Sequence, residues 1–205
     1  MRATGQVIAE RGVAGLTVGQ VAQKANIAVG TIYTRFADRD ALVAAFAADF
    51  FARARGASAR ALSDERCARL DACGLAERVV RLLVEGYRAH RRLLSALYLH
   101  ARTRPDAVTA DVASADADFA ARLTALFLAR RAELTHPRPE RAIAVALLML
   151  DGAAKEAVLF GRGAEAALDD ADLIAELTRA FAASLTLLPP SSPTTIRATG
   201  THTPP

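Results

Sequence analysis

The chain has 205 residues, 52% of them hydrophobic, which allows one large or two small domains with an ample core. The formal net charge is +4 and the isoelectric point is near 9.6, which permits nucleic-acid binding. The basic residues are spread along the chain, however, so charge alone identifies no partner. The apolar runs are too short to cross a bilayer, and residues 1–11 lack the apolar core of a signal peptide. We therefore expect a cytoplasmic protein with no membrane partner.

The residue types that form catalytic or metal sites lack the required spacing. The four histidines show no metal-ligand pattern, and no phosphate-binding glycine loop, nucleophile elbow or paired-carboxylate signature occurs. Cys67 and Cys73 are six residues apart and do not share a helix face, so a mutual disulfide is not expected and a redox role is the alternative. We expect no enzyme activity, no cofactor and no metal.

The first three predicted helices lie close together at the start of the chain. One ends at Gly12, and a second begins at Val18, because Thr17 followed by Gln20 forms a capping box. Asn26 marks the next turn, since asparagine enters the left-handed region more readily than most residues. A second apolar face follows, made by Ile27, Val29, Ile32, Tyr33 and Phe36. The segment therefore predicts a helix-turn-helix, with an ordinary helical hairpin in an all-α core as the alternative.

The rest of the chain predicts a series of amphipathic helices. A linker with a short helix is expected between Ala57 and Gly74, where the apolar pattern weakens, and Ser114 is a candidate break in one helix. The predicted helices are Arg39 to about Arg55, capped by Asp38 and ended by Gly56; Leu75–Tyr87; Arg91–Ala101; a helix opened by Pro105 that stops before His136; Pro139–Phe160; and Asp170–Leu188.

The predicted helix Pro139–Phe160 has apolar residues on two nearly opposite sides. One side carries Ile143, Ala146, Leu147, Leu150, Ala154 and Ala157, and the other carries Val145, Leu148, Gly152 and Leu159. This pattern predicts burial on both sides, so the helix could pair with its copy in a dimer. A helix buried within one chain is the alternative. Asp151 and Lys155, one turn apart, are expected to form an ion pair at the rim of that helix pairing.

The segment VAQKANIAVGTIYTRFADRDAL, from Val21 to Leu42, resembles the TetR family of transcriptional regulators. The match in residue order covers residues 7–42, and beyond it the resemblance lies in helix number, order and length. It implies an all-α fold in which an N-terminal three-helix DNA-binding domain is followed by a C-terminal helical ligand-binding and dimerisation domain. The first helix is usually longer in the family, so we expect a start assigned too far downstream or a truncated chain.

The resemblance also implies roles for residues near the helix-turn-helix. Thr17 and Gln20 match positions that touch phosphate, with pure capping as the alternative. Ala28 and Val29 open the recognition helix but cannot hydrogen-bond, so their reading of bases is limited to contact with a thymine methyl, and the hydroxyls of Thr31 and Thr34 become the candidates for base edges. The remaining expected phosphate contacts are Tyr33, Arg35 and Arg39, for which a core aromatic and solvated surface charges are the alternatives.

The family also implies a small-molecule pocket and a dimer interface in the later helices. The candidates for the pocket are apolar or amphipathic residues on faces that should converge, namely Tyr87, Tyr98, His100, Phe119 and Met149. For each of them a place in the ordinary core is the alternative. The candidates for the interface are Leu148, Gly152, Leu159 and Phe181, on the last two predicted helices.

These expectations combine into one functional hypothesis. We expect a DNA-binding domain at 1–45, an effector-binding and dimerisation domain at 46–188, and a disordered tail at 189–205. The predicted protein is a homodimeric transcriptional repressor that binds a palindromic operator in double-stranded DNA and is released by a small apolar molecule. Two alternatives stay open: an all-α ligand-binding or enzymatic protein whose helix-turn-helix is only structural, and an architectural DNA-binding protein without an effector.

Overall fold

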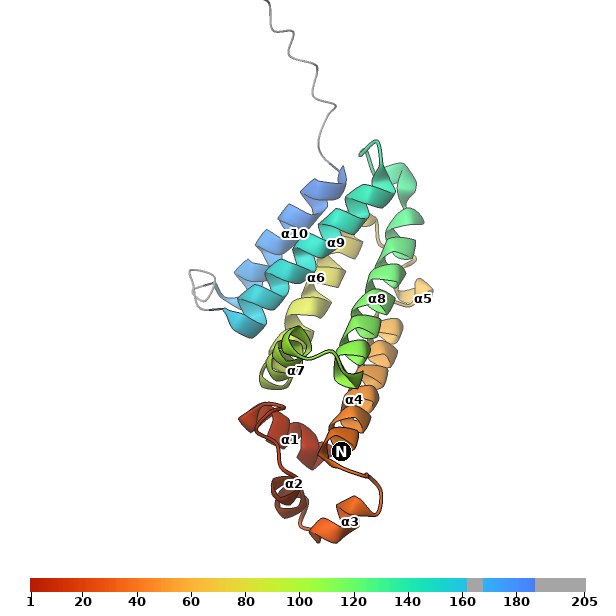
Figure 1. Cartoon of the computed structure of the whole chain (residues 1–205). Helices are drawn as coiled ribbons and strands as arrows, with labels where there is room; N and C mark the ends of the chain where they lie inside the picture. Colours follow the sequence, from red (N-terminus) through yellow and green to blue (C-terminus); the bar gives the residue numbers. More distant parts are fainter. Residues whose placement is uncertain (162–167, 187–205) are drawn as a thin grey trace, which may run out of the picture.

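The computed structural model describes residues 1–161 and 168–186, and within these residues all regular structure is helical (Figure 1). The predicted tail at 189–205 lies outside the described residues. None of the described helices has the length and apolar character needed to span a membrane. The elements are α1 (Arg2–Arg11), α2 (Val18–Ala25), α3 (Val29–Tyr33), α4 (Arg39–Ala61), α5 (Asp64–Cys67), α6 (Ala72–Ala89), α7 (Arg91–Thr103), α8 (Ala107–Leu128), the 3-10 turn η1 (Arg131–Glu133), α9 (Pro139–Lys155), the π-helical segment η2 (Glu156–Phe160) and α10 (Asp170–Thr186).

Helices α1, α2 and α3 form a small unit at one end of the molecule (Figure 1). Gly12 ends α1 with a φ of 74°, a left-handed value that glycine adopts without strain, which confirms the predicted stop. An ion pair between Lys24 and Glu10 joins α2 to α1. The apolar side chains of Ile8, Leu16 and other residues of this unit are buried and continuous with the main core.

Helix α4 connects this unit to the rest of the chain without interruption. It begins at Arg39, where the Asp38 carboxylate accepts from the backbone N–H of Ala41 at 2.7 Å. The predicted end at Gly56 was wrong, because the helix continues to Ala61. A glycine weakens a helix by only about 1 kcal/mol relative to alanine. Leu62, just beyond the helix, is completely buried, and its packing favours the continued helix.

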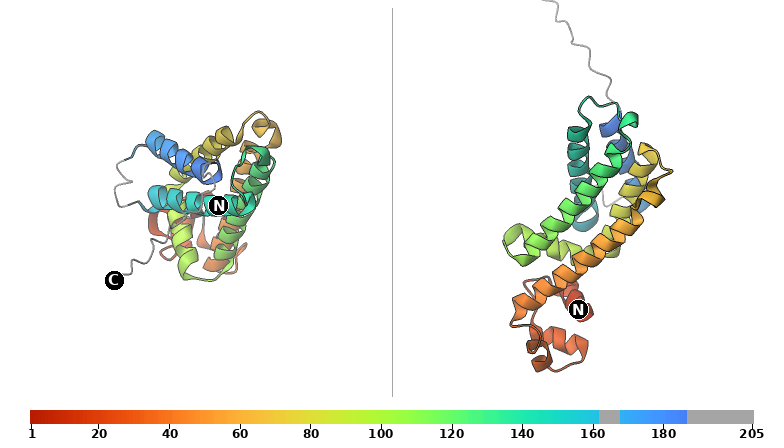
Figure 2. Two further views of the ribbon diagram at one scale, coloured as in Figure 1. Left: turned by 90° about the horizontal axis from the view of Figure 1, so that it is seen from above. Right: turned by 90° about the vertical axis from the view of Figure 1, so that its right-hand side faces the viewer.

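The other helices surround a common core above the N-terminal unit in Figure 1, and α8 lies along α4 in Figure 1 and in the right-hand view of Figure 2. Helix α8 starts at Ala107 after an Asp106 cap, rather than at Pro105, and it continues unbroken past Ser114. Helix α9 begins at Pro139 as predicted, and α10 packs against both α9 and α6. Helix α7 packs against α1, so it joins the main body to the N-terminal unit.

Candidate nucleic-acid interface and internal cavity

The turn that positions the recognition helix is built by local hydrogen bonds. The Thr17 hydroxyl accepts from the Gln20 backbone N–H at 3.3 Å, and the Gln20 side-chain oxygen accepts from the Thr17 backbone N–H at 3.0 Å. At the other end of α2, Asn26 adopts a left-handed conformation with φ 53° and ψ 47°. The predicted capping box and turn are therefore confirmed, and α2 and α3 form a helix-turn-helix.

The predicted apolar face of α3 was only partly correct. Ile32 is 5% exposed and packs into the core, but Ile27, Val29 and Tyr33 are 45%, 43% and 53% exposed. Helix α3 has only five residues and lies at the end of the molecule, where one side of it meets the core and the other meets no neighbouring helix (Figure 1). The sequence pattern could not distinguish a covered apolar face from an open one.

The open side of the helix-turn-helix collects most of the sequence-predicted DNA contacts. Its surface combines methyl groups, hydroxyls and one guanidinium, and one of the hydroxyls, that of Thr34, donates to the Thr31 carbonyl at 2.8 Å. Gln20 is half-buried, in keeping with its bond to the helix start. The exposed members are Thr17, Ala28, Val29, Thr31, Tyr33, Thr34 and Arg35.

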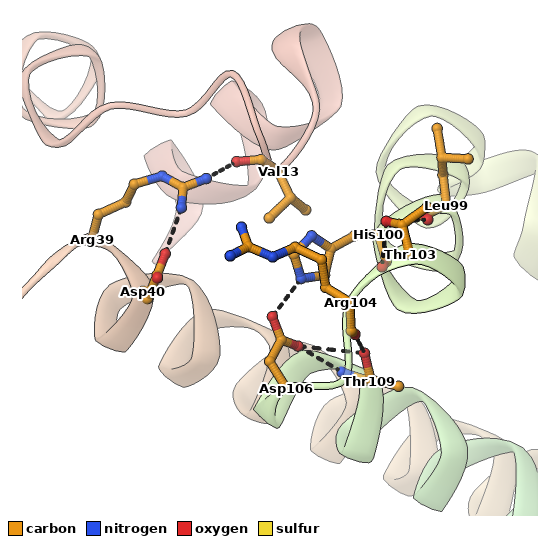
Figure 3. Close-up of polar contacts among 9 residues, drawn as sticks. All are labelled: Val13, Arg39, Asp40, Leu99, His100, Thr103, Arg104, Asp106 and Thr109. Carbon is orange, nitrogen blue, oxygen red and sulfur yellow. Dashed lines mark hydrogen bonds and ion pairs between the residues drawn. The ribbon is translucent and has the colours of Figure 1, made fainter.

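Arg39 occupies a different environment from Arg35. Its Nη2 donates to the Val13 carbonyl and its Nη1 pairs with Asp40 (Figure 3). Its Nε donates to the Leu16 carbonyl at 2.9 Å. Arg39 is therefore not simply a solvated surface charge, which was the alternative drawn from the sequence. The guanidinium holds the start of α4 against the α1–α2 loop, which satisfies two backbone carbonyls of that loop.

A second polar contact lies at the turn between α7 and α8, in the same region (Figure 3). The His100 side chain is only 9% exposed, and its Nε2 lies 2.6 Å from an Asp106 oxygen. Burial raises the Asp106 pKa, but hydrogen bonds from His100 and from the backbone N–H groups of Thr109 and Val108 outweigh it and hold the pKa below its usual value. His100 thus belongs to this turn and does not line the cavity described next.

A cavity of about 1620 Å³, partly open to solvent, lies between α4, α6, α7, α8 and α9. Three of the five predicted pocket residues, Tyr87, Tyr98 and Phe119, line it. Met149 does not; it is 54% exposed and borders a shallow groove between α9 and α10. Apolar side chains of α4, which were not among the predicted pocket residues, form much of the opposite wall, among them Phe50 and Phe51.

Polar side chains from four helices meet in the cavity wall. The Tyr87 hydroxyl donates to Asp151 at 2.8 Å, and the Tyr98 hydroxyl donates to Asp116 at 2.6 Å. The Lys155 ammonium lies 2.7 Å from an oxygen of each aspartate, and 4.2 Å from the centre of the Tyr98 ring. Burial first, and the neighbouring carboxylates second, hold the pKa of Tyr98 far above its ordinary value, so its hydroxyl stays a neutral donor. Burial also raises the Tyr87 pKa.

The ion pair between Asp151 and Lys155 was predicted, but its position at the cavity was not. Both residues lie beside the cavity, and neither is at the rim of an external helix face. Asp116 was missed altogether, because no spacing rule links it to α9. A usable signal existed on α9: Asp151 follows the buried Leu150, and Lys155 follows the buried Ala154, so both sit next to the inner stripe.

The second apolar side of α9 is open in the single chain. Val145 and Leu148 are 55% and 73% exposed, and Gly152 is exposed between them and the end of the helix. Leu159 and Phe181 were wrongly placed in an interface: they are 5% and 3% exposed in the chain's own core. The ring of Phe181 packs edge-on against Phe127, with 5.3 Å between their centres.

The cysteines and acidic residues add no further site among residues 1–161 and 168–186. Cys67 is buried and Cys73 is exposed, and both are free. No group of three or more histidine, cysteine, aspartate or glutamate side chains in this part of the chain is arranged to hold a metal ion.

Comparison with known proteins relates the N-terminal segment to one family. Residues 1–46 match the family profile of bacterial regulatory proteins, tetR family. The comparison with curated protein sequences found no match. Several solved structures share the fold over nearly their full lengths.

A protein described as a TetR-family transcriptional regulator from Mesorhizobium loti has 16% identity and a TM-score of 0.72, with 89% of this chain and 91% of that chain covered. A transcriptional regulator from Rhodococcus sp. Rha1 has 21% identity and a TM-score of 0.67, with coverage of 92% and 96%. The regulator FadR from Bacillus subtilis, in complex with stearoyl-CoA, has 16% identity and a TM-score of 0.63, with coverage of 90% and 95%. Residues 1–46 therefore match the N-terminal segment of the tetR family of bacterial regulatory proteins, and the whole chain shares the fold of these solved regulators.

Proposed function

We propose that the protein is a transcriptional repressor that binds a palindromic operator as a homodimer and is released by a small, largely apolar molecule. The observation that carries the proposal is the connection between two sites in one chain. An open helix-turn-helix surface lies at one end, and a cavity lies among helices of the main body. Helix α7 contributes Tyr98 to the cavity and packs against α1 of the helix-turn-helix unit.

The DNA contacts follow from exposure and chemistry. Tyr33 and Arg35 present a hydroxyl and a guanidinium to solvent and would contact phosphates, as would Thr17 at the start of α2. Gln20 would act mainly through its cap, because its side-chain oxygen already accepts a bond. Arg39 would contribute positive charge near the backbone, with its guanidinium donors directed to protein carbonyls.

Base reading would use the exposed small residues of α3 and its flanks. The Thr31 and Thr34 hydroxyls can donate to or accept from base edges in a major groove. The methyl groups of Ala28 and Val29 can contact only a thymine methyl. This set has few long polar side chains, so the proposed recognition relies on close approach of the short helix to the bases.

The proposed dimer forms through α9 and α10. The exposed face of α9 carries Val145, Leu148 and Met149, three large apolar side chains that are each more than half exposed in the single chain. Gly152, on the same face, would allow close approach of a partner helix. A two-fold axis through this face makes the interface self-complementary and gives two recognition helices, which requires an operator with inverted half-sites.

The cavity supplies the proposed effector site. Its volume of about 1620 Å³ exceeds that of a typical small-molecule pocket. The FadR structure from Bacillus subtilis holds stearoyl-CoA, which is a precedent for a large ligand in this fold. An effector that favours one arrangement of α7 would change the placement of α1, and linkage then requires that DNA binding weaken as effector binding strengthens.

The test is selection of binding sites from a pool of random double-stranded DNA, followed by a thermal-shift screen of apolar compounds. We expect enrichment of an inverted repeat, and compounds that raise the melting temperature while weakening binding to that repeat. Absence of any enriched sequence would contradict the proposal. An inverted repeat whose affinity no stabilising compound changes would contradict the release by an effector and favour an architectural protein.

A further inference from the structure

One polar group at the cavity wall, formed by side chains of α6, α7, α8 and α9, carries a net negative charge. Its charged members are two carboxylates that line the cavity, Asp116 and Asp151, and the Lys155 ammonium that bonds to both. Tyr87 and Tyr98 donate to the carboxylates as neutral hydroxyls. The group of five side chains therefore sums to one negative charge, held in a wall that is otherwise mostly apolar.

The negative part of this group is the part that a ligand can reach. The side chains of Asp116 and Asp151 are 40% and 38% exposed, whereas that of Lys155 is 12% exposed. The ammonium bonds to both carboxylates, and the ring of Tyr98 covers it at 4.2 Å. An ionised carboxylate has about four acceptor positions. Each aspartate uses one position for a tyrosine and one for Lys155, so acceptor capacity remains on the exposed carboxylates.

The other charged side chains of the lining are Arg53, Arg55, Asp64, Asp118 and Arg122, and no ion pair among the described residues joins them to this group. At the α4–α8 edge, Arg55 lies 3.7 Å from Asp118, and Arg53 pairs with Asp49 at 2.9 Å. With Asp49 included, these residues carry equal numbers of positive and negative charges. Deeper in, Phe50, Phe51, Leu83, Phe119 and Leu147 provide apolar and aromatic surface. Aromatic faces attract cations as well as apolar groups.

We propose that the effector is an organic cation, a protonated amine joined to a largely apolar body, with its ammonium group bound by Asp116 and Asp151. This inference rests on the proposed effector site and names the chemical class that fits it. A protonated amine supplies the N–H donors that the carboxylates can still accept, and its charge neutralises the group. An anionic amphiphile of the same shape would place like charges together in a site partly removed from water.

The experiment compares three probes that share one alkyl chain: decylamine, decanol and decanoate. Their dissociation constants are measured by calorimetry at neutral pH on the full chain. We expect decylamine to bind roughly 10- to 100-fold more tightly than decanol, the range given by one hydrogen bond between charged groups. Decanoate should bind more weakly than decanol. Equal or tighter binding of decanoate would overturn the proposal.

Single substitutions test whether Asp116 and Asp151 produce the preference for decylamine over decanol. Asp116→Asn and Asp151→Asn should each reduce the preference for decylamine over decanol while leaving decanol affinity unchanged, which also shows that the cavity is intact. Asp118→Asn is the matched control, since Asp118 is two residues from Asp116 but lies at the cavity edge. A preference that persists in both cavity variants, or that falls in the control, overturns the assignment.

A further variant, at Lys155, covers the case in which the asparagine variants do not fold. Lys155→Gln removes the internal ammonium and leaves both carboxylates, so the preference for decylamine should increase; a decrease overturns the proposal.

Fluorescence anisotropy with the selected operator separates this proposal from the proposed function. If decanol and decanoate release the DNA and decylamine shows no preference, the repressor stands and the cation fails. If decylamine is preferred but the protein enriches no operator sequence, the cationic ligand stands and the proposed repressor fails.

Discussion

The Nε atom of Arg39 donates a hydrogen bond to the carbonyl oxygen of Leu16 at 2.9 Å. This contact joins the first residue of α4 to the residue just before the cap of α2. The same guanidinium also donates to the Val13 carbonyl. Arg39 therefore joins the start of α4 to the loop that precedes the helix-turn-helix, in addition to any charge it presents to DNA.

Replacing Arg39 with alanine should destabilise the protein. The loss of charge-assisted bonds to two carbonyls should lower the free energy of unfolding by about 1–3 kcal/mol. For a chain of this size that corresponds to a drop of about 2–4 °C in melting temperature per kcal/mol. Calorimetry measures it, with the exposed Arg35→Ala as the control that should melt like wild type. An unchanged melting temperature for Arg39→Ala would show that these bonds do not stabilise the fold.

Arg35→Ala should weaken DNA binding without changing its specificity. If the exposed guanidinium contacts a phosphate, its loss lowers affinity for operator and random DNA by similar factors. The slope of log affinity against log salt should fall by about one unit. Salt-titrated anisotropy on both DNAs measures this. A loss confined to the operator would instead assign Arg35 to base reading.

Thr31→Ala should reduce the sequence specificity of DNA binding, unlike Arg35→Ala. The exposed hydroxyl is proposed to reach a base edge, so its removal should cost about 1–3 kcal/mol on the operator and little on random DNA. The specificity ratio should therefore decrease while the salt dependence stays the same. Equal losses on both DNAs would place Thr31 at a phosphate. Ile32→Ala is unsuitable as a control, because Ile32 is buried and its loss would disturb the fold.

Introducing a negative charge on the open face of α9 should convert the proposed dimer to monomers. Leu148→Glu and Val145→Glu each place a carboxylate where a partner helix is proposed to pack, which would bury an unpaired charge. Leu148 also borders the cavity, whereas Val145 does not, so agreement between the two variants assigns the effect to the interface. Leu99→Glu is the control, since Leu99 is 59% exposed on α7. Light scattering measures the mass; a monomeric wild type at micromolar concentration would refute the dimer.

The contact between Asp106 and His100 should make stability depend on pH in the acid range. Burial opposes ionisation of Asp106, but its hydrogen bonds prevail, so its pKa is lower in the folded chain than in the unfolded chain. A lowered carboxyl pKa adds stability above the unfolded value near 3.9, and that stability is lost as the pH falls through the folded value. Asp106→Asn keeps a capping side chain but no charge. In denaturant titrations below about pH 5, its stability should fall less steeply than that of wild type; parallel curves would contradict this reasoning.

The sequence by itself determined the features that depend on neighbours a few residues apart. The bonds between Thr17 and Gln20, the left-handed Asn26 and the stop at Gly12 are all local, and each was predictable because its partners are close along the chain. The order of residues 21–42 then indicated a resemblance to the TetR family, whose profile matches residues 1–46. The helix periods of α6, α7 and α9 were predictable for the same reason, since each follows from one segment.

Tertiary structure alone decided which apolar and charged faces are covered. Leu148 and Leu159 have the same pattern in the sequence, yet one is open and the other is buried, because burial depends on which distant helix packs there. Asp116 approaches Lys155 from 39 residues away, and Arg39 reaches Val13 from 26 residues away. Such contacts arise from the packing of whole helices, in which each side chain's environment is set by elements that no local spacing identifies.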